Sequence, residues 1–218
     1  MKYFLLAYTF LILSGLCHAQ KTFPAYAADI QNFKKQDSAN YPPQNAILLV
    51  GSSSFTRWTD VNNYFPGYTV INRGFGGSTL KDVIRYTYDI IIPYHPKQIV
   101  IYCGEYDVAE GVPAEEVFTT FKTLYQMVRT NLPSTVIHFV SLKPSPSRQP
   151  LLPEMKKVNQ LVNGFIRKEK NAGFINVFPA MLNKNGEIME DIFVADSLHL
   201  NAKGYAIWQK VLQPHLVK

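Results

Sequence analysis

The sequence contains few cysteines. Only Cys17 and Cys103 occur among its 218 residues. We expect residues 1–19 to be removed as a leader, which would leave Cys103 as the single cysteine of the mature protein. An intramolecular disulfide would then be impossible, so core packing must stabilise the fold without one. Cys103 ends an apolar run, where we expect a buried thiol rather than a nucleophile.

The sequence also lacks a concentrated block of charge. Charged residues make up 17% of the chain and hydrophobic residues 47%, which is typical of a globular protein rather than a disordered one. The net charge of +6 is spread out, and its densest basic spots are pairs such as Lys34-Lys35 and Lys156-Lys157. Nucleic-acid binding needs a clustered patch or stripe, so we expect no nucleic-acid partner.

Metal-binding and nucleotide-binding patterns are missing as well. His95, His138 and His215 are scattered, and no histidine or cysteine pair has the spacing of metal ligands. His138 lies inside an apolar run, where a core or edge position is expected. The glycines of Gly74–Gly77 follow the second apolar run and do not match a dinucleotide fingerprint. We therefore expect neither a metal nor an organic cofactor.

One long hydrophobic run is present, at the start of the chain. Lys2 precedes the apolar stretch Tyr3–Leu16, and Ala19 supplies the small residue that signal peptidase needs. The run is too short for a comfortable membrane span, so we expect a signal peptide over residues 1–19. Leu16 is bulky where a lipoprotein signal needs a small residue before Cys17, which argues against a lipid anchor. The sequence thus predicts a secreted or periplasmic protein.

Five short apolar runs, several of them rich in β-branched residues, alternate with longer segments of helical period. The predicted strands are Ala46–Val50, Thr69–Asn72, Gln98–Cys103, Thr135–Ser141 and Phe174–Phe178. Several are almost continuously apolar, as strands buried on both faces are. The alternation indicates an α/β domain with a parallel sheet covered by helices on both sides.

Helical periodicity marks four segments between and after these strands. They lie over residues 80–91, 117–128, 155–166 and 205–212. Pro113 is a start signal for the second helix, and Asn201 can cap the last. No linker or internal repeat divides the chain, so we expect a single domain over residues 20–218.

Polar motifs follow the predicted strands. Gly51–Ser54 follows the first strand, Asn72–Ser78 the second and Gly104–Asp107 the third, while Asp196 and His199 lie beyond the fifth. In open parallel sheets, ligands bind beyond the carboxyl ends of the strands. On a helical turn, the β-carbons of an acidic residue and a histidine three positions apart lie roughly 5–6 Å from each other. The acid can orient that imidazole as a base for a serine nucleophile.

These motifs, in this order, resemble the SGNH (GDSL) hydrolase family. The blocks that carry the resemblance are Leu49–Phe55, Asn72–Ser78, Tyr102–Asp107 and Asp196–Asn201. The resemblance covers most of the chain after the leader. It implies a flavodoxin-like three-layer α/β/α sandwich with a central, mainly five-stranded parallel sheet, and it implies a carboxylic ester hydrolase without a cofactor.

The resemblance also implies roles for individual residues. Ser53 would be the nucleophile, with Ser52 in place of the aspartate that commonly precedes it. His199 would be the general base and acid, and Asp196 would orient it. The backbone N–H groups of Ser53 and Gly77 would be two donors of the oxyanion hole.

Tyr106 departs from the family pattern, because an asparagine that donates a third hydrogen bond to the oxyanion usually stands there. Loss of one such donor typically costs about 10²–10³ in rate. Three interpretations are open: a rim aromatic beside a two-donor hole, a hydroxyl that donates after a local rearrangement, or a catalytically impaired binding protein.

The substrate is less sharply defined by the sequence. We expect a small-molecule or carbohydrate ester with a short acyl group such as acetyl. A lysophospholipase- or thioesterase-like lipid ester hydrolase is the alternative. Trp58, Arg73 and Phe75 are candidate substrate contacts near the predicted mouth, although Trp58 can also be core and Arg73 can bond loop carbonyls. The sequence does not indicate the oligomeric state.

Overall fold

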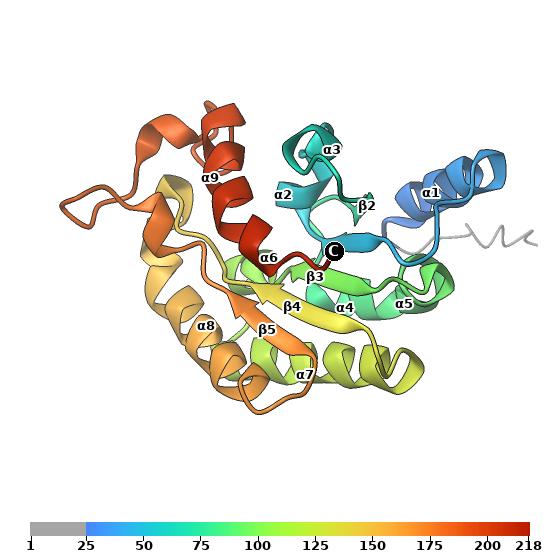
Figure 1. Ribbon diagram of the computed structural model, residues 1–218. Helices are drawn as coiled ribbons and strands as arrows, with labels where there is room; N and C mark the ends of the chain where they lie inside the picture. Colours follow the sequence, from blue (N-terminus) through green and yellow to red (C-terminus); the bar gives the residue numbers. More distant parts are fainter. Residues whose placement is uncertain (1–24) are drawn as a thin grey trace, which may run out of the picture.

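A five-stranded parallel sheet forms the centre of the computed structural model, which describes residues 25–218 (Figure 1). The strand order is β2-β1-β3-β4-β5. The strands are β1 (Ile47–Gly51), β2 (Val70–Gly74), β3 (Gln98–Tyr102), β4 (Val136–Val140) and β5 (Ala172–Ile175). The order reverses between β1 and β3, so the segments after these two strands meet at the switch point where flavodoxin-like folds bind ligands.

Helices cover both faces of this sheet (Figure 1). One face carries α4 (Leu80–Arg85), α5 (Thr87–Ile90), α7 (Ala114–Asn131) and α8 (Leu152–Ile166). The other carries α2 (Ser53–Thr56), α3 (Val61–Tyr64) and α9 (Ala202–Leu212). Two more helices are α1 (Ala27–Ala39) and α6 (Glu105–Ala109). The three-layer α/β/α architecture expected from the sequence is confirmed.

Side chains of each strand alternate between two cores. In β1, Leu48 and Val50 pack with the α4, α7 and α8 side, whereas Ile47 and Leu49 pack with the α9 side. All four are at most 1% exposed. The alternation follows from the two-residue period of a strand, and burial on both faces explains why β1 reads as a continuous apolar run.

The predicted strands and longer helices are present, but several details differ, and the short helices α2, α3 and α6 were not predicted. The helix expected over residues 80–91 breaks at Tyr86 into α4 and α5. The fifth strand ends at Ile175 rather than Phe178, because the Asn176 side chain accepts a hydrogen bond from the Phe178 N–H and turns the chain. Helix α1 was not predicted. Asn201 caps α9 as expected, by accepting hydrogen bonds from the Lys203 and Gly204 N–H groups.

The predicted signal peptide, residues 1–19, lies outside the described residues. Among the helices within residues 25–218, none combines the length and the apolar character needed to cross a membrane.

Candidate active site

The β1–α2 turn holds Ser53 at the carboxyl edge of the sheet. Gly51 has a φ of +133°, and a β-carbon there would lie 2.0 Å from the Tyr102 carbonyl oxygen, so only glycine fits. The Ser52 N–H donates to that carbonyl at 2.9 Å, and the Phe75 N–H donates to the Gly51 carbonyl at 2.9 Å. Both neighbouring strand ends therefore fix the turn that presents Ser53.

A tight loop before α9 carries Asp196 and His199. Ser197 has a φ of +55°, and the Val194 N–H closes the loop on the His199 carbonyl at 2.8 Å. Asp196 Oδ1 accepts hydrogen bonds from the Leu198 and His199 N–H groups, both at 2.9 Å. The two side chains thus meet through a turn closed by the aspartate itself, and not on a helix as their spacing suggested.

Three side chains form a continuous hydrogen-bonded chain. His199 Nε2 lies 3.0 Å from Ser53 Oγ, although the residues are 146 positions apart, and His199 Nδ1 lies 2.6 Å from Asp196 Oδ2. The imidazole is only 13% exposed, whereas Asp196 is 42% exposed. The structure therefore brings the predicted nucleophile, base and acid together. Their catalytic roles stay a prediction.

Hydrogen bonding keeps Asp196 ionised. Burial by itself raises the pKa of its carboxyl, but hydrogen bonds from the His199 backbone and ring and from the Leu198 N–H outweigh this effect. They hold the pKa of Asp196 well below its usual range. A carboxylate fixed in this way favours the tautomer in which Nδ1 carries the proton and Nε2 accepts one from the serine hydroxyl.

Two backbone donors face no partner of their own. Neither the Ser53 N–H nor the Gly77 N–H donates a hydrogen bond to another residue of the described range. Gly77 lies in the β2–α4 loop, and a β-carbon there would be 3.6 Å from the Tyr106 ring. The predicted third donor position is therefore occupied by an aromatic ring in van der Waals reach of Gly77, and this tyrosine is 38% exposed.

Contacts from β3 and α6 hold the β2–α4 loop. The Leu80 N–H donates to both carboxylate oxygens of Asp107, at 3.2 and 3.1 Å, and Cys103 Sγ donates to the Ser78 carbonyl at 3.3 Å. Burial raises the pKa of Asp107 to about 6, although the hydrogen bond from Leu80 lowers it. The pKa of the Cys103 thiol is raised, mainly by burial and to a smaller extent by the nearby charge of Asp107. Cys103 is thus the buried thiol that the sequence predicts.

The sequence-based prediction gave no role to a buried ion pair beside Tyr106. Lys143 Nζ lies 2.6 Å from Glu105 Oε2, and the Tyr102 hydroxyl donates to the same carboxylate. Lys143 is 1% exposed and Glu105 is 7% exposed. Both follow strands, β4 and β3, at the edge that carries the site. The sequence signal that could have indicated this ion pair is a lysine directly after an apolar strand, because residues after parallel strands lie at the ligand-binding edge of the sheet.

Asn72 also supports the site, although the sequence analysis gave its side chain no role. Its side-chain amide donates to the carbonyls of Phe55 at 2.7 Å and Trp58 at 3.3 Å, and its oxygen accepts from the Gly74 N–H at 2.9 Å. It therefore ties the α2 segment to the start of the β2–α4 loop.

The three side chains predicted to contact the substrate are buried. Trp58 and Phe75 are 0% exposed. Trp58 stacks on Tyr205 with ring centroids 4.7 Å apart, and Phe75 belongs to the core on the opposite face. Arg73 is 7% exposed, pairs with Asp37 of α1 and donates to the Tyr94 hydroxyl at 2.7 Å. These side chains serve packing and the docking of α1, because burial leaves them no surface to offer a substrate.

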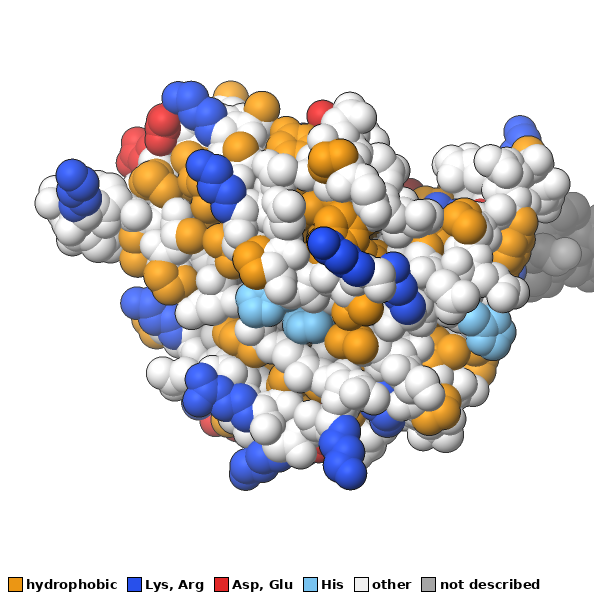
Figure 2. Space-filling model, viewed as in Figure 1, with side chains coloured by type: hydrophobic (Ala, Val, Ile, Leu, Met, Phe, Trp, Pro, Cys, Tyr) orange, Lys and Arg blue, Asp and Glu red, His pale blue; other side chains and the backbone are white. Residues whose placement is uncertain are grey.

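The remaining expectations concern the other histidines and the distribution of surface charge. His138 Nδ1 lies 2.9 Å from Gln98 Nε2, and burial, with His215 nearby, lowers the pKa of His138 to about 4. Within residues 25–218, no cluster of three or more His, Cys, Asp and Glu side chains is arranged to hold a metal ion. On the face of the described residues seen in Figure 2, lysines and arginines are scattered and form no continuous patch.

Comparisons with known proteins identify relatives of the chain. The model of the GDSL-like lipase/acylhydrolase family matches residues 39–207. Platelet-activating factor acetylhydrolase IB subunit alpha1 of Pongo abelii is 28% identical over 145 residues, or 65% of this chain. The match spans 61% of the length of that relative.

Solved structures show the same fold. A GDSL-like lipase from Bacteroides thetaiotaomicron has a TM-score of 0.70 at 19% identity, covering 86% of this chain and 97% of the other. A catalytic mutant of Axe2, an acetylxylan esterase from Geobacillus stearothermophilus, has a TM-score of 0.64 at 15% identity, covering 79% and 94%.

Proposed function

The chain belongs to the GDSL-like lipase/acylhydrolase family of carboxylic ester hydrolases, and on this premise we propose that it is a serine esterase acting through Ser53, His199 and Asp196. One observation carries the proposal. A single imidazole lies 3.0 Å from the Ser53 hydroxyl through one nitrogen and 2.6 Å from a carboxylate through the other. This arrangement is the one that general-base activation of a serine requires.

Acylation follows from this geometry. Ser53 Oγ attacks the ester carbonyl carbon while its proton passes to His199 Nε2, and the carbonyl π electrons move onto the oxygen. Asp196 stabilises the resulting imidazolium. When the tetrahedral intermediate collapses, the alcohol leaves with the proton from His199, and the acyl group stays on Ser53 as an ester.

Deacylation uses the same groups in reverse order. His199 Nε2 takes a proton from a water molecule, whose oxygen attacks the acyl carbon of the Ser53 ester. The second tetrahedral intermediate collapses when His199 returns the proton to Ser53 Oγ, and the carboxylic acid leaves. No other reactant is needed.

The Ser53 and Gly77 N–H groups are the proposed oxyanion donors. Backbone donors that are fixed before the reaction stabilise the developing negative charge without reorganisation. The Tyr106 ring beside Gly77 favours the interpretation of a rim aromatic with a two-donor hole. Such a hole predicts a slower enzyme than a three-donor relative, and not an inactive one.

We propose an acetyl ester as the substrate. Two similar proteins carry acetyl in their names, the platelet-activating factor acetylhydrolase subunit and the structural neighbour that is an acetylxylan esterase. The Tyr106 ring also narrows the space beside Gly77. A lysophospholipase- or thioesterase-like activity would instead give a kcat/KM that rises with acyl length in a series of 4-nitrophenyl esters.

We further propose that the protein is exported. The support is the sequence of residues 1–19, a lysine followed by an apolar run and a small residue. Mass spectrometry of protein from the periplasm or medium of an expressing bacterium should give a mature chain that begins near Gln20. An intact Met1 would reject this part of the proposal.

Hydrolysis of 4-nitrophenyl acetate tests the nucleophile. We expect Ser53→Ala to abolish both turnover and labelling by a fluorophosphonate probe. Ser54→Ala is a matched control, since the neighbouring Ser54 side chain is only 1% exposed and takes no part in the contacts between Ser53, His199 and Asp196. Equal hydrolysis by wild type and Ser53→Ala would reject Ser53 as the nucleophile.

A further inference from the structure

Tyr26, directly before α1, has a strained backbone and packs against the candidate active site. Its φ of +62° lies in the left-handed region, which residues with bulky side chains rarely adopt. Strain of this kind persists only where the surrounding contacts enforce it, and it is concentrated at functional sites. Tyr26 precedes residues 39–207, the part of the chain that the family model matches. The strain therefore points to a role outside the motifs that the family shares.

The Tyr26 ring lies on the β2–α4 loop, which carries the Gly77 N–H group. Gly76 has a φ of +43°, and a β-carbon there would overlap the Tyr26 ring, so the ring is seated on the bare backbone of this glycine. The ring also meets the Phe75 ring edge to face, with the centroids 5.3 Å apart. Tyr26 thus contacts the two residues that directly precede Gly77.

A second tyrosine contacts the loop at the next position. The Tyr106 ring of α6 is the nearest group to a β-carbon built on Gly77, at 3.6 Å. Consecutive glycines have more backbone freedom than other residues, and they have no side chains with which to pack. Aromatic rings from outside the loop, Tyr26 at Gly76 and Tyr106 at Gly77, supply the packing that these two glycines lack.

Contacts on both sides of the loop hold Tyr26 in place. The Tyr86 hydroxyl, directly after α4, donates to the Ala25 carbonyl at 2.6 Å. At the other end of α1, Asp37 pairs with Arg73 of β2. The two anchors lie on the elements before and after the β2–α4 loop, so the loop and the start of α1 are fixed to each other.

We propose that Tyr26 is a positioning residue that holds the Gly77 N–H in the orientation in which it donates to the oxyanion. The inference rests on the proposed esterase function, and it assigns Tyr26 no contact with the substrate. With Tyr106 at the third donor position, the proposed hole depends on two backbone donors, so the orientation of each matters more. A misplacement of about 1 Å in a catalytic geometry can cost about 10²-fold in rate.

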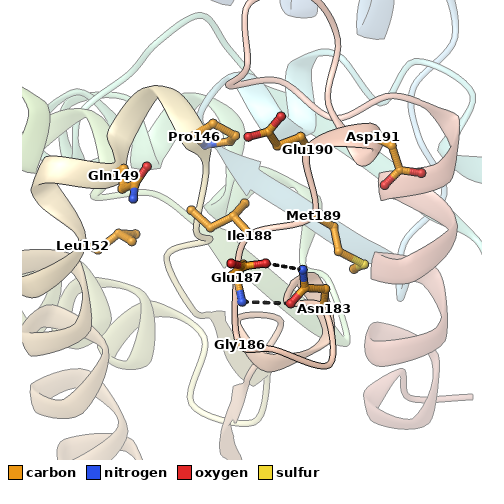
Figure 3. A pocket seen from close by; sticks show the side chains of 10 residues that line it. All are labelled: Pro146, Gln149, Leu152, Asn183, Gly186, Glu187, Ile188, Met189, Glu190 and Asp191. Carbon is orange, nitrogen blue, oxygen red and sulfur yellow. Dashed lines mark hydrogen bonds between the residues drawn. The ribbon is translucent and has the colours of Figure 1, made fainter.

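A small ester restricts the test to the reacting groups. The largest groove of the described residues, of about 940 Å³, lies between η2 (Pro146–Leu151) and residues 183–191, and the residues that line it include neither Ser53 nor His199 (Figure 3). A large alcohol could contact this groove as well as the site, whereas 4-nitrophenyl acetate is too small to do so. Changes in the hydrolysis of this ester therefore report on the catalytic groups.

Three variants separate positioning from general packing. Tyr26→Asn removes the ring, and asparagine tolerates left-handed backbone, so the start of α1 keeps its conformation. Tyr26→Phe keeps the ring and removes only the hydroxyl. Tyr41→Ala is the matched control, because Tyr41 is a tyrosine just after α1 that contacts Pro93 and Tyr94 rather than the β2–α4 loop.

We expect Tyr26→Asn to lower kcat on 4-nitrophenyl acetate by about 10- to 100-fold with KM nearly unchanged, because the lost interaction acts only on the transition state. The rate of labelling by a fluorophosphonate probe should fall by a similar factor, since the same donors stabilise that reaction. Tyr26→Phe should restore both rates, and Tyr41→Ala should behave as wild type.

Two results would overturn the inference alone. One is an active wild type with an equally active Tyr26→Asn. The other is a rise in KM at constant kcat in Tyr26→Asn, which would make Tyr26 a substrate contact. An equal loss of kcat in Tyr41→Ala would also contradict it, because general loosening of the segment would then explain the effect. A wild type that neither hydrolyses the ester nor reacts with the probe would instead overturn the esterase proposal, and the inference with it.

Discussion

Replacement of Asp107 by asparagine should make the protein more stable at neutral pH. Asp107 is 3% exposed, and its carboxylate accepts the Leu80 N–H at the start of α4. Burial raises its pKa from an ordinary value of 3.8 to about 6. Asparagine retains an oxygen that can accept the same hydrogen bond and carries no charge at any pH, so the variant isolates the cost of the buried charge.

The sign and size follow from proton linkage. The folded protein keeps the Asp107 proton up to about pH 6, whereas the unfolded chain releases it near pH 3.8. The folded state therefore binds more protons in this window, and its stability falls as the pH rises through it. At 1.36 kcal/mol per pH unit, the interval between the two pKa values corresponds to about 3 kcal/mol. The free energy of unfolding of Asp107→Asn, relative to wild type, should rise by about 2.5 kcal/mol between pH 4 and pH 8, because the unfolded carboxyl is already more than half ionised at pH 4.

Urea unfolding followed by tryptophan fluorescence at unit steps from pH 4 to pH 8 measures this difference. Asp60→Asn, which removes an exposed carboxylate, is the control for the change in net charge, and its difference from wild type should be nearly constant. A difference between Asp107→Asn and wild type that stays constant from pH 4 to pH 8 would refute the assignment of a buried, proton-retaining carboxyl.

Three further substitutions test the site and its support. Tyr106→Asn should raise kcat on 4-nitrophenyl acetate, by up to about 10²-fold, if an amide restores a third oxyanion donor; a fall in kcat would show that the tyrosine contacts the substrate productively. Asp196→Asn should lower kcat by about 10⁴-fold because the imidazole loses its orienting carboxylate, and a kcat close to wild type would exclude that role. Asn201→Ala should lower the free energy of unfolding by about 1–2 kcal/mol because α9 loses its cap, which thermal unfolding can check; an unchanged unfolding temperature would contradict it.

Much of the fold could be predicted from local patterns in the chain. The apolar run Ala46–Val50 predicts a strand buried on both faces, and Asn201 predicts the start of α9; both are confirmed. These patterns are readable because helix and strand periods, and the capping of exposed N–H groups, depend on neighbours in sequence. The residues that follow parallel strands meet at the carboxyl edge of the sheet. Ser53 could therefore be placed near the switch point from the order of the strands alone.

Side-chain surroundings could not be predicted in the same way. In the sequence, an aromatic residue such as Trp58 near the Ser53 motif is equally compatible with a position at the rim of the site and one in the core. The structure shows that it is in the core, where it packs against Tyr205 and other residues of α9. Arg73 found its carboxylate partner on α1, a helix without a clear sequence pattern. The deciding contacts join residues far apart in the chain, and periodicity carries no information on them.

The sequence by itself determined the order of the five strands and of the helices α7, α8 and α9, the burial of Cys103 and the edge of the sheet at which Ser53, Asp196 and His199 gather. The tertiary structure alone decided the 3.0 Å approach of His199 to Ser53 and the position of the Tyr106 ring against Gly77. The physical reason is that secondary structure and edge placement follow from local periodicity and connectivity, whereas distances across the site depend on how loops from separate strands pack against one another.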